Sequence, residues 1–176
     1  MKEKINLDEY VGTIVNSLRK GLLLNTQGEK FNSMTIAWGH LGCIWNEPTF
    51  VAYVRDSRYT KTQLDATGEF TISVPLGKPD PKIVKVCGTL SGRDVDKAKE
   101  AGLTLEAPEV ISTPGVKEYP LTLECQVLYS QKQEHLLLPD DVKAKFYPSN
   151  VERNHDNAND PHTAYIAKIV AAYIVK

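Results

Sequence analysis

Short runs of apolar and β-branched residues, separated by Gly, Asn and Pro, recur along most of the chain and constrain its fold more than any other feature. Such runs are typical of β-strands, and the turn-forming residues between them indicate where each strand ends. The last run also contains alanines, which would permit a helix, but its Tyr, Ile and Val content favours a strand. The predicted strands are Leu22–Thr26, Met34–Trp38, Thr49–Arg55, Phe70–Val74, Val110–Ser112, Leu121–Ser130 and Tyr165–Val175, with turns at Gln27–Gly28 and Asn46–Pro48.

Three segments have a helical pattern instead, with apolar residues at three- and four-residue steps or with a capping residue at the start. They do not alternate regularly with the strands, and neither a dinucleotide-binding nor a P-loop glycine pattern occurs. The sequence therefore predicts a mainly β protein, a β-barrel or an α+β domain, rather than a doubly wound parallel sheet. The predicted helices are Leu7–Leu18, Ser57–Thr67 and Arg93–Ala101, each closed by a glycine at Gly21, Gly68 or Gly102.

Length and charge exclude several classes of protein. The 176 residues suit one domain over 1–176, with an N-terminal helix in 1–20 and a polar loop over 148–162. Since 21 Lys and Arg oppose 22 Asp and Glu, we expect no nucleic-acid partner. No apolar run reaches membrane-spanning length and the N-terminus lacks a signal-peptide pattern, so we expect a cytoplasmic protein with no membrane partner. Neither the three cysteines nor the four histidines have metal-ligand spacing, so we expect no metal.

Two arginines and two hydroxyl side chains lie at the junction of a predicted strand and a predicted helix. Arg55 ends the strand, and Ser57, Arg58 and Thr60 fall on the first turn of the helix. Free backbone N–H groups, guanidinium groups and hydroxyls together suit a phosphate monoester. The alternative is structural: Ser57 caps the helix and Arg58 pairs with Asp56.

A second polar segment precedes the predicted strand at residue 34. Asn32, Ser33 and Thr35 offer hydrogen-bond donors and acceptors, and Met34 offers a polarizable thioether. This combination suits a planar heterocycle, and Trp38 could flank such a ring. The alternatives are an ordinary polar turn and a tryptophan in the core.

Two further places are candidates for chemistry. Ser91 and Arg93 repeat the combination of a hydroxyl and a guanidinium near a predicted helix start, where a capped surface helix is the alternative. His162 ends the polar loop and is the histidine best placed for proton handling or ligand contact, with a solvated loop residue as the alternative. Cys87 lies in a Val-rich setting, which indicates a buried and inert thiol.

Taken together, these segments resemble the flavin reductase-like family, which includes the flavoredoxins. The resemblance implies an antiparallel, six-stranded split β-barrel that binds FMN, with added helices. It also implies a homodimer with FMN near the subunit interface. The matching segments appear in the family's order and are Asn32–Trp38, Val54–Thr60, Phe70–Ser73, Cys87–Lys97 and Pro161–Tyr165.

The resemblance also implies roles for individual residues. Asn32–Thr35 would line the isoalloxazine, and Arg55, Ser57, Arg58 and Thr60 would hold the ribityl phosphate. His162 would lie near the reacting face of the flavin or the nicotinamide, whereas Ser91–Arg93 would shape either the site or the dimer contact.

The implied activity is hydride transfer from NAD(P)H to flavin, with electrons passed to a small-molecule or protein acceptor. One alternative is an electron carrier of the flavoredoxin type, without nicotinamide turnover. The other is a non-redox split barrel for heme or another phosphate-bearing ligand. Two departures from the family pattern leave the acceptor open: Val74-Pro75 stands where some relatives carry aromatics, and no aromatic residue directly precedes His162.

Overall fold

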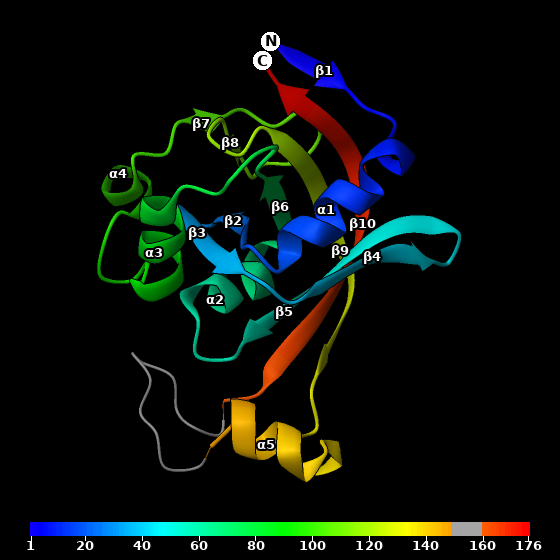
Figure 1. The fold of residues 1–176 in the computed structure, drawn as a ribbon, viewed down its shortest axis with the longest axis vertical. Helices are drawn as coiled ribbons and strands as arrows, with labels where there is room; N and C mark the ends of the chain where they lie inside the picture. The colour runs from blue at the N-terminus through cyan, green and yellow to red at the C-terminus, as the bar shows by residue number, and fades with distance from the viewer. Residues whose placement is uncertain (149–159) are drawn as a thin grey trace.

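A computed structural model describes residues 1–148 and 160–176, and its centre is one strongly curved antiparallel sheet (Figure 1). The strand order is β3-β2-β6-β9-β10-β5-β4, and β1 pairs with β10. The mainly β, α+β fold class predicted from the sequence is therefore confirmed. The strands of this sheet are β1 (Lys2–Lys4), β2 (Leu22–Gln27), β3 (Phe31–Ile36), β4 (Gly39–Ile44), β5 (Glu47–Arg55), β6 (Glu69–Val74), β9 (Leu121–Lys132) and β10 (His162–Val175).

Short helices surround the sheet. In Figure 1, α3 and α4 lie beside β3, and α5 lies beyond the lower ends of β9 and β10. A two-stranded sheet of β7 (Leu105–Glu106) and β8 (Gly115–Val116) lies near β6. Within the described residues, no helix is long and apolar enough to cross a membrane. The helices are η1 (Leu7–Tyr10), α1 (Val11–Leu18), α2 (Tyr59–Thr67), α3 (Pro81–Thr89), α4 (Lys97–Ala101), η2 (His135–Leu137) and α5 (Asp140–Phe146).

The long strand β10 places the site residue His162 beside the end of β5. It pairs with β9 on one side and with β5 on the other, and its first residue, His162, stands opposite Arg55 in the register. Register shifts at Ile166/Ala167 and Ile169/Ala171 interrupt its pairing with β9. Such irregularities bend a strand, which suits a sheet that curls around a core.

The apolar run at the start of β2 is buried on both faces of its strand. Leu22 and Leu24 belong to the core inside the curved sheet, together with Phe50, Phe70 and Tyr165. Leu23 points the opposite way, into a second core beneath α3 and α4. Because successive side chains of a strand point to opposite faces, a continuous apolar run predicts such double burial. The second core contains Leu23, Ile83, Cys87, Ala101, Val116 and Tyr119, so the predicted burial of Cys87 is confirmed.

Two predicted segments are wrong in extent or type. The strand predicted at 110–112 does not form, because the backbone N–H groups of Glu109, Val110 and Ile111 donate to the buried carboxylate of Glu124 at 2.6–3.1 Å. The helix predicted from residue 93 begins only at Lys97, where the side chain of Asp96 accepts from the Lys99 N–H.

The observed bounds of two other predicted segments, a turn and a strand, also differ from the predicted ones. The turn predicted at 46–48 is instead formed by Trp45 and Asn46, with φ of 54° and 60°, and 47–48 belong to β5. The strand predicted from Met34 begins at Phe31 and ends at Ile36. The helix α3 has no counterpart among the predicted helices, although Asp80 caps it and Pro81 opens it.

Candidate functional site

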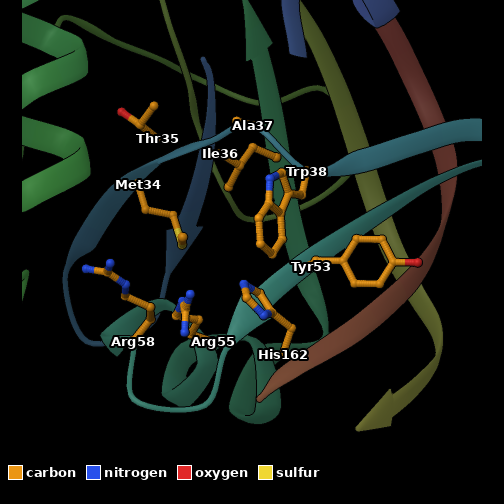
Figure 2. Close-up of a pocket in the computed structure, with 9 residues that line it drawn as sticks. All are labelled: Met34, Thr35, Ile36, Ala37, Trp38, Tyr53, Arg55, Arg58 and His162. Carbon is orange, nitrogen blue, oxygen red and sulfur yellow. The ribbon is translucent and has the colours of Figure 1, made fainter. Parts of the chain in front are cut away.

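Two cavities meet where β3, α2 and the start of β10 come together. The wider one has a volume of about 190 Å³ and is shown in Figure 2. The narrower one lies against α2 and the segment before α4, and the two share Met34 and Arg58. Every site residue predicted from the sequence except Ser33 lines one of them. The wider cavity has Met34, Thr35, Trp38, Arg55, Arg58 and His162; the narrower one has Asn32, Met34, Ser57, Arg58, Thr60, Ser91 and Arg93.

Flat side chains form one wall of the wider cavity. Trp38 follows β3, and its ring centroid lies 4.8 Å from that of His162, with the planes tilted by 38°. Phe146 meets Trp38 edge-on at 5.3 Å. Figure 2 shows the Met34 thioether pointing toward the same space from the opposite side. Such a slot suits a flat aromatic ligand.

His162 is not the solvated loop residue that was the alternative, because it begins β10 and is buried. Burial and the positive charges of Arg55 and Arg58, against a smaller opposite effect of Asp56, together lower its pKa to about 4. The imidazole is therefore neutral at physiological pH. Its Nδ1 lies 2.8 Å from the Tyr147 hydroxyl.

The guanidinium of Arg55 lies at the cavity wall but bonds to the protein backbone. Its two terminal nitrogens donate to the carbonyl oxygens of Phe146, at 3.1 Å, and Asp160, at 3.2 Å. The same group lies 5.2 Å from the centre of the Tyr147 ring. Arg55 thus ties the end of α5 and the residues before β10 to the end of β5.

Ser57 donates to a carboxylate of the chain itself. Its hydroxyl and its backbone N–H both bond to Asp160, at 2.5 and 3.0 Å. The helix α2 begins at Tyr59, after Arg58 in the N-cap position, so the alternative that Ser57 caps the helix is wrong. Its neighbour Asp56 pairs with Lys132 at 2.6 Å and accepts from Thr163, and these contacts lower the pKa of Asp56 although its partial burial raises it.

The narrower cavity is lined by polar side chains from three segments. Asn32 donates its amide N–H to the Thr60 hydroxyl at 2.8 Å, while its Oδ1 is buried without a hydrogen bond among the described residues. This oxygen faces Gly92, where a Cβ would lie only 2.1 Å away. Arg93 donates to the Ser57 carbonyl at 2.9 Å and so braces the turn before α2.

Lys97 is a buried cation of this cavity and was not among the predicted site residues. Its ammonium donates to the carbonyls of Ser33, at 2.9 Å, and Cys87, at 3.1 Å. Burial, opposed by Cys87 and strengthened by the positive charge of Arg58, lowers the pKa of Lys97 to about 8. The residue ends the segment Cys87–Lys97 that resembled the flavin reductase-like family, and that resemblance was the available signal. Ser33 itself is buried outside both cavities.

Two sequence comparisons match this chain to known proteins. The family sequence model described as "Flavin reductase like domain" matches residues 17–176. An uncharacterized protein of Archaeoglobus fulgidus is 29% identical over 141 residues, which cover 80% of this chain and 76% of that protein.

Two solved structures share the fold. The flavoredoxin of Desulfovibrio vulgaris (Miyazaki F) has a TM-score of 0.66 and 22% identity, over 90% of this chain and 70% of that one. The FMN-binding domain of a flavin reductases-like enzyme from Shewanella baltica OS155 has a TM-score of 0.66 and 16% identity, over 99% and 77%. The predicted split-barrel fold is thereby confirmed.

Proposed function

This chain belongs to the flavin reductase-like domain family, and on that premise we propose that it binds FMN and uses it to take electrons from NAD(P)H and pass them to an acceptor. One observation carries the proposal. A cavity with a flat aromatic wall adjoins, at Met34 and Arg58, a narrower cavity lined by cations. A ligand with a flat ring at one end and an anionic group at the other matches this pair of cavities.

The residues of the wider cavity suit the isoalloxazine ring. Trp38 and His162 offer two faces for stacking, and Met34 offers a polarizable contact from the other side. Asn32 lines the narrower cavity instead, where its Oδ1, without a hydrogen bond among the described residues, suits a hydroxyl of the ligand, since a buried polar atom without a partner costs free energy. Thr35 lines the wider cavity while its hydroxyl donates to the Val84 carbonyl.

The residues of the narrower cavity suit the phosphate. Arg58, Arg93 and Lys97 bring three cationic groups, and Thr60 and Ser91 bring hydroxyls. Guanidinium and ammonium groups form the shorter, charge-assisted bonds that phosphate oxygens prefer. We expect these residues to hold the phosphate, and Arg55 to act mainly on the backbone that it binds.

Bound FMN would supply the redox chemistry, so the protein needs only to bind, orient and polarise it. The described part of the site fits these tasks of binding, orienting and polarising FMN. Its single buried imidazole is neutral, and its cations line the narrower cavity, where the phosphate would lie. We propose that the nicotinamide binds transiently beside the flavin.

The visible spectrum of the purified protein tests the proposal. We expect the two absorption bands of oxidised flavin, release of FMN on denaturation, and bleaching when NADH or NADPH is added without oxygen. A colourless protein that also fails to bind added FMN in a fluorescence titration would overturn the proposal. A heme spectrum would instead support a non-redox or heme-binding split barrel.

A second candidate is an electron carrier, and the structural likeness to a flavoredoxin favours it. Such a protein would bind FMN but would not turn over nicotinamides. Stopped-flow mixing distinguishes the two, because only a reductase bleaches at a rate that saturates with NADH or NADPH concentration.

We also propose a homodimer as the functional form. Large apolar side chains remain exposed on the β4–β5 turn and on β9, at Trp45, Leu128 and Tyr129. Light scattering coupled to gel filtration tests this, and a mass of one chain at micromolar concentration would contradict it.

A further inference from the structure

Three polar groups behind the wider cavity form a closed hydrogen-bond cluster. The Tyr147 hydroxyl lies 2.8 Å from His162 Nδ1 and 3.0 Å from Gln133 Oε1. The same Oε1 accepts the backbone N–H of His162 at 3.3 Å. The Tyr147 ring is buried and stacks edge-on against both His162 and His135.

The backbone determines the direction of every bond in this cluster. The His162 N–H can only donate, so the Gln133 atom that faces it is the oxygen and not the amide nitrogen. An amide oxygen can only accept, so the Tyr147 hydroxyl gives it its one proton. The phenolic oxygen is then left to accept, and the proton between Tyr147 and His162 belongs to Nδ1.

We propose that Gln133 and Tyr147 are positioning residues that hold His162 in its Nδ1–H form, so that Nε2 presents an accepting lone pair to the wider cavity. There it binds an N–H or O–H group of the ligand. A carbonyl or phosphate oxygen is disfavoured at that point, because two lone pairs would face each other.

The placement of the ring agrees with this proposal. His162 lines the wider cavity, and Figure 2 shows its ring directed into the space between Trp38 and the arginines. Within the chain as far as it is described, no hydrogen bond occupies Nε2. The charged groups around the ring are Arg55, Arg58 and Asp56, and their combined effect with burial keeps the imidazole neutral above about pH 5.

The identity of the donor group rests on the proposed function. If FMN and a nicotinamide meet in this cavity, two sources of an N–H group exist: the flavin ring and the carboxamide of the nicotinamide. Both share the chemistry that Nε2 requires. The two sources are distinguished by whether the FMN affinity or the KM for the nicotinamide changes.

The tautomer is measured by long-range ¹H–¹⁵N correlation NMR of histidine-labelled protein at pH 8, as purified and without nicotinamide. We expect a pyrrole-like Nδ1 and a pyridine-like Nε2 for His162. Gln133→Leu removes the oxygen that takes the Tyr147 proton, so the hydroxyl is free to donate to Nδ1 and the proton moves to Nε2. Gln133→Glu keeps an accepting oxygen and therefore keeps the Nδ1–H form.

Matched controls and a second variant complete the test. Gln126→Leu and Tyr129→Phe change exposed residues of β9 and leave the His162 signals unchanged. Tyr147→Phe removes the acceptor of the Nδ1 proton and raises the Nε2–H population even if Gln133→Leu does not fold. An Nε2–H signal in the wild type, or unchanged signals in both Gln133→Leu and Tyr147→Phe, would overturn the assignment.

The second part of the proposal, a hydrogen bond between Nε2 and the ligand, is tested by binding constants. In Gln133→Leu, we expect roughly tenfold weaker FMN binding if the flavin is the donor, or a roughly tenfold higher KM for the nicotinamide at unchanged FMN affinity if the carboxamide is. If both constants stay unchanged while the tautomer has moved, no ligand donor bonds to Nε2. If the wild type binds no FMN, the proposed function fails, whereas the tautomer result stands by itself.

Discussion

The carboxylate of Asp160 accepts two hydrogen bonds from Ser57, one from the hydroxyl at 2.5 Å and one from the backbone N–H at 3.0 Å. The turn before α2 thus already binds an anionic group, and that group belongs to the chain. Ser57 also lines the narrower cavity. A phosphate bound in that cavity would lie beside a negative charge of the protein itself.

We predict that Asp160→Asn strengthens FMN binding by roughly tenfold, because it removes a negative charge near the phosphate while an amide oxygen still accepts from Ser57. Isothermal titration of the FMN-free protein measures the change. Asp8→Asn, at the distant η1, is the matched control and leaves the affinity unchanged. Weaker binding in Asp160→Asn would show that the carboxylate organises the site rather than competing with the phosphate.

The two arginines of the junction are predicted to differ in their effects. Arg58 lines both cavities, so Arg58→Ala reduces FMN affinity by roughly 10- to 100-fold. Arg55 donates to the carbonyls of Phe146 and Asp160, so Arg55→Ala removes both hydrogen bonds from these part-buried oxygens and lowers the free energy of unfolding by about 1–3 kcal/mol.

Fluorescence titration with FMN and urea unfolding measure the two effects separately. Arg19→Ala, at the exposed end of α1, is the control for loss of a positive charge and changes neither quantity. Equal losses of affinity in Arg55→Ala and Arg58→Ala would place both guanidinium groups on the phosphate.

Local patterns in the sequence were sufficient to predict most of the sheet. Strand periodicity and turn residues predicted β2, β5, β6, β9 and β10 to within a few residues, because burial of alternate side chains is a property of each strand alone. The cavity residues were predicted from the chemistry of their side chains and from the resemblance to the family. Asn32–Thr35 lie within β3, Arg55–Thr60 span the end of β5 and the start of α2, and the antiparallel register brings His162 opposite Arg55.

The contacts that tune the site depend on residues far apart in the sequence. Nothing near Asp160 indicates that it binds Ser57, 103 positions away, and nothing near Gln133 indicates that it sets the direction of the Tyr147–His162 bond. Lys97 had the sequence environment of an exposed helix residue, and only the packing of α3, α4 and β3 buries it. Such pairings follow from tertiary structure and have no local period.

A further prediction concerns the close contact of Gly92 with Asn32. A Cβ at residue 92 would lie 2.1 Å from Asn32 Oδ1 and 2.9 Å from the Tyr59 ring, so Gly92→Ala displaces the Asn32 amide. We expect a loss of about 1–3 kcal/mol in the free energy of unfolding, as for other overpacked sites, and weaker FMN binding. Gly42→Ala, where nothing lies within 4 Å of the added methyl group, is the control.

Urea unfolding and FMN titration of both glycine variants check this prediction. If Gly92→Ala binds FMN as the wild type does while Asn32→Ala does not, the backbone has room to move, and the closeness of Gly92 to Asn32 serves packing alone.

The buried ammonium of Lys97 predicts a dependence of stability on pH. Its pKa is about 8 in the folded protein against a usual value of 10.5, so between these values the unfolded chain binds more protons than the folded one. The free energy of unfolding therefore rises with pH across this window, by up to about 3 kcal/mol from this group, and the gain is lost as the pH falls to 8. Lys97→Met removes the rise, whereas Lys99→Met, on the exposed side of α4, keeps it.

Bound FMN should change this pH dependence if its phosphate lies in the narrower cavity. A dianion near the Lys97 ammonium favours the charged form and raises the pKa of Lys97, so saturation with FMN flattens the rise in stability between pH 8 and 10.5. Urea unfolding at several pH values, with and without FMN, measures the difference. A rise that is equally steep in both conditions would place the phosphate away from Lys97, and would leave Arg58 and Thr60 as its nearer donors.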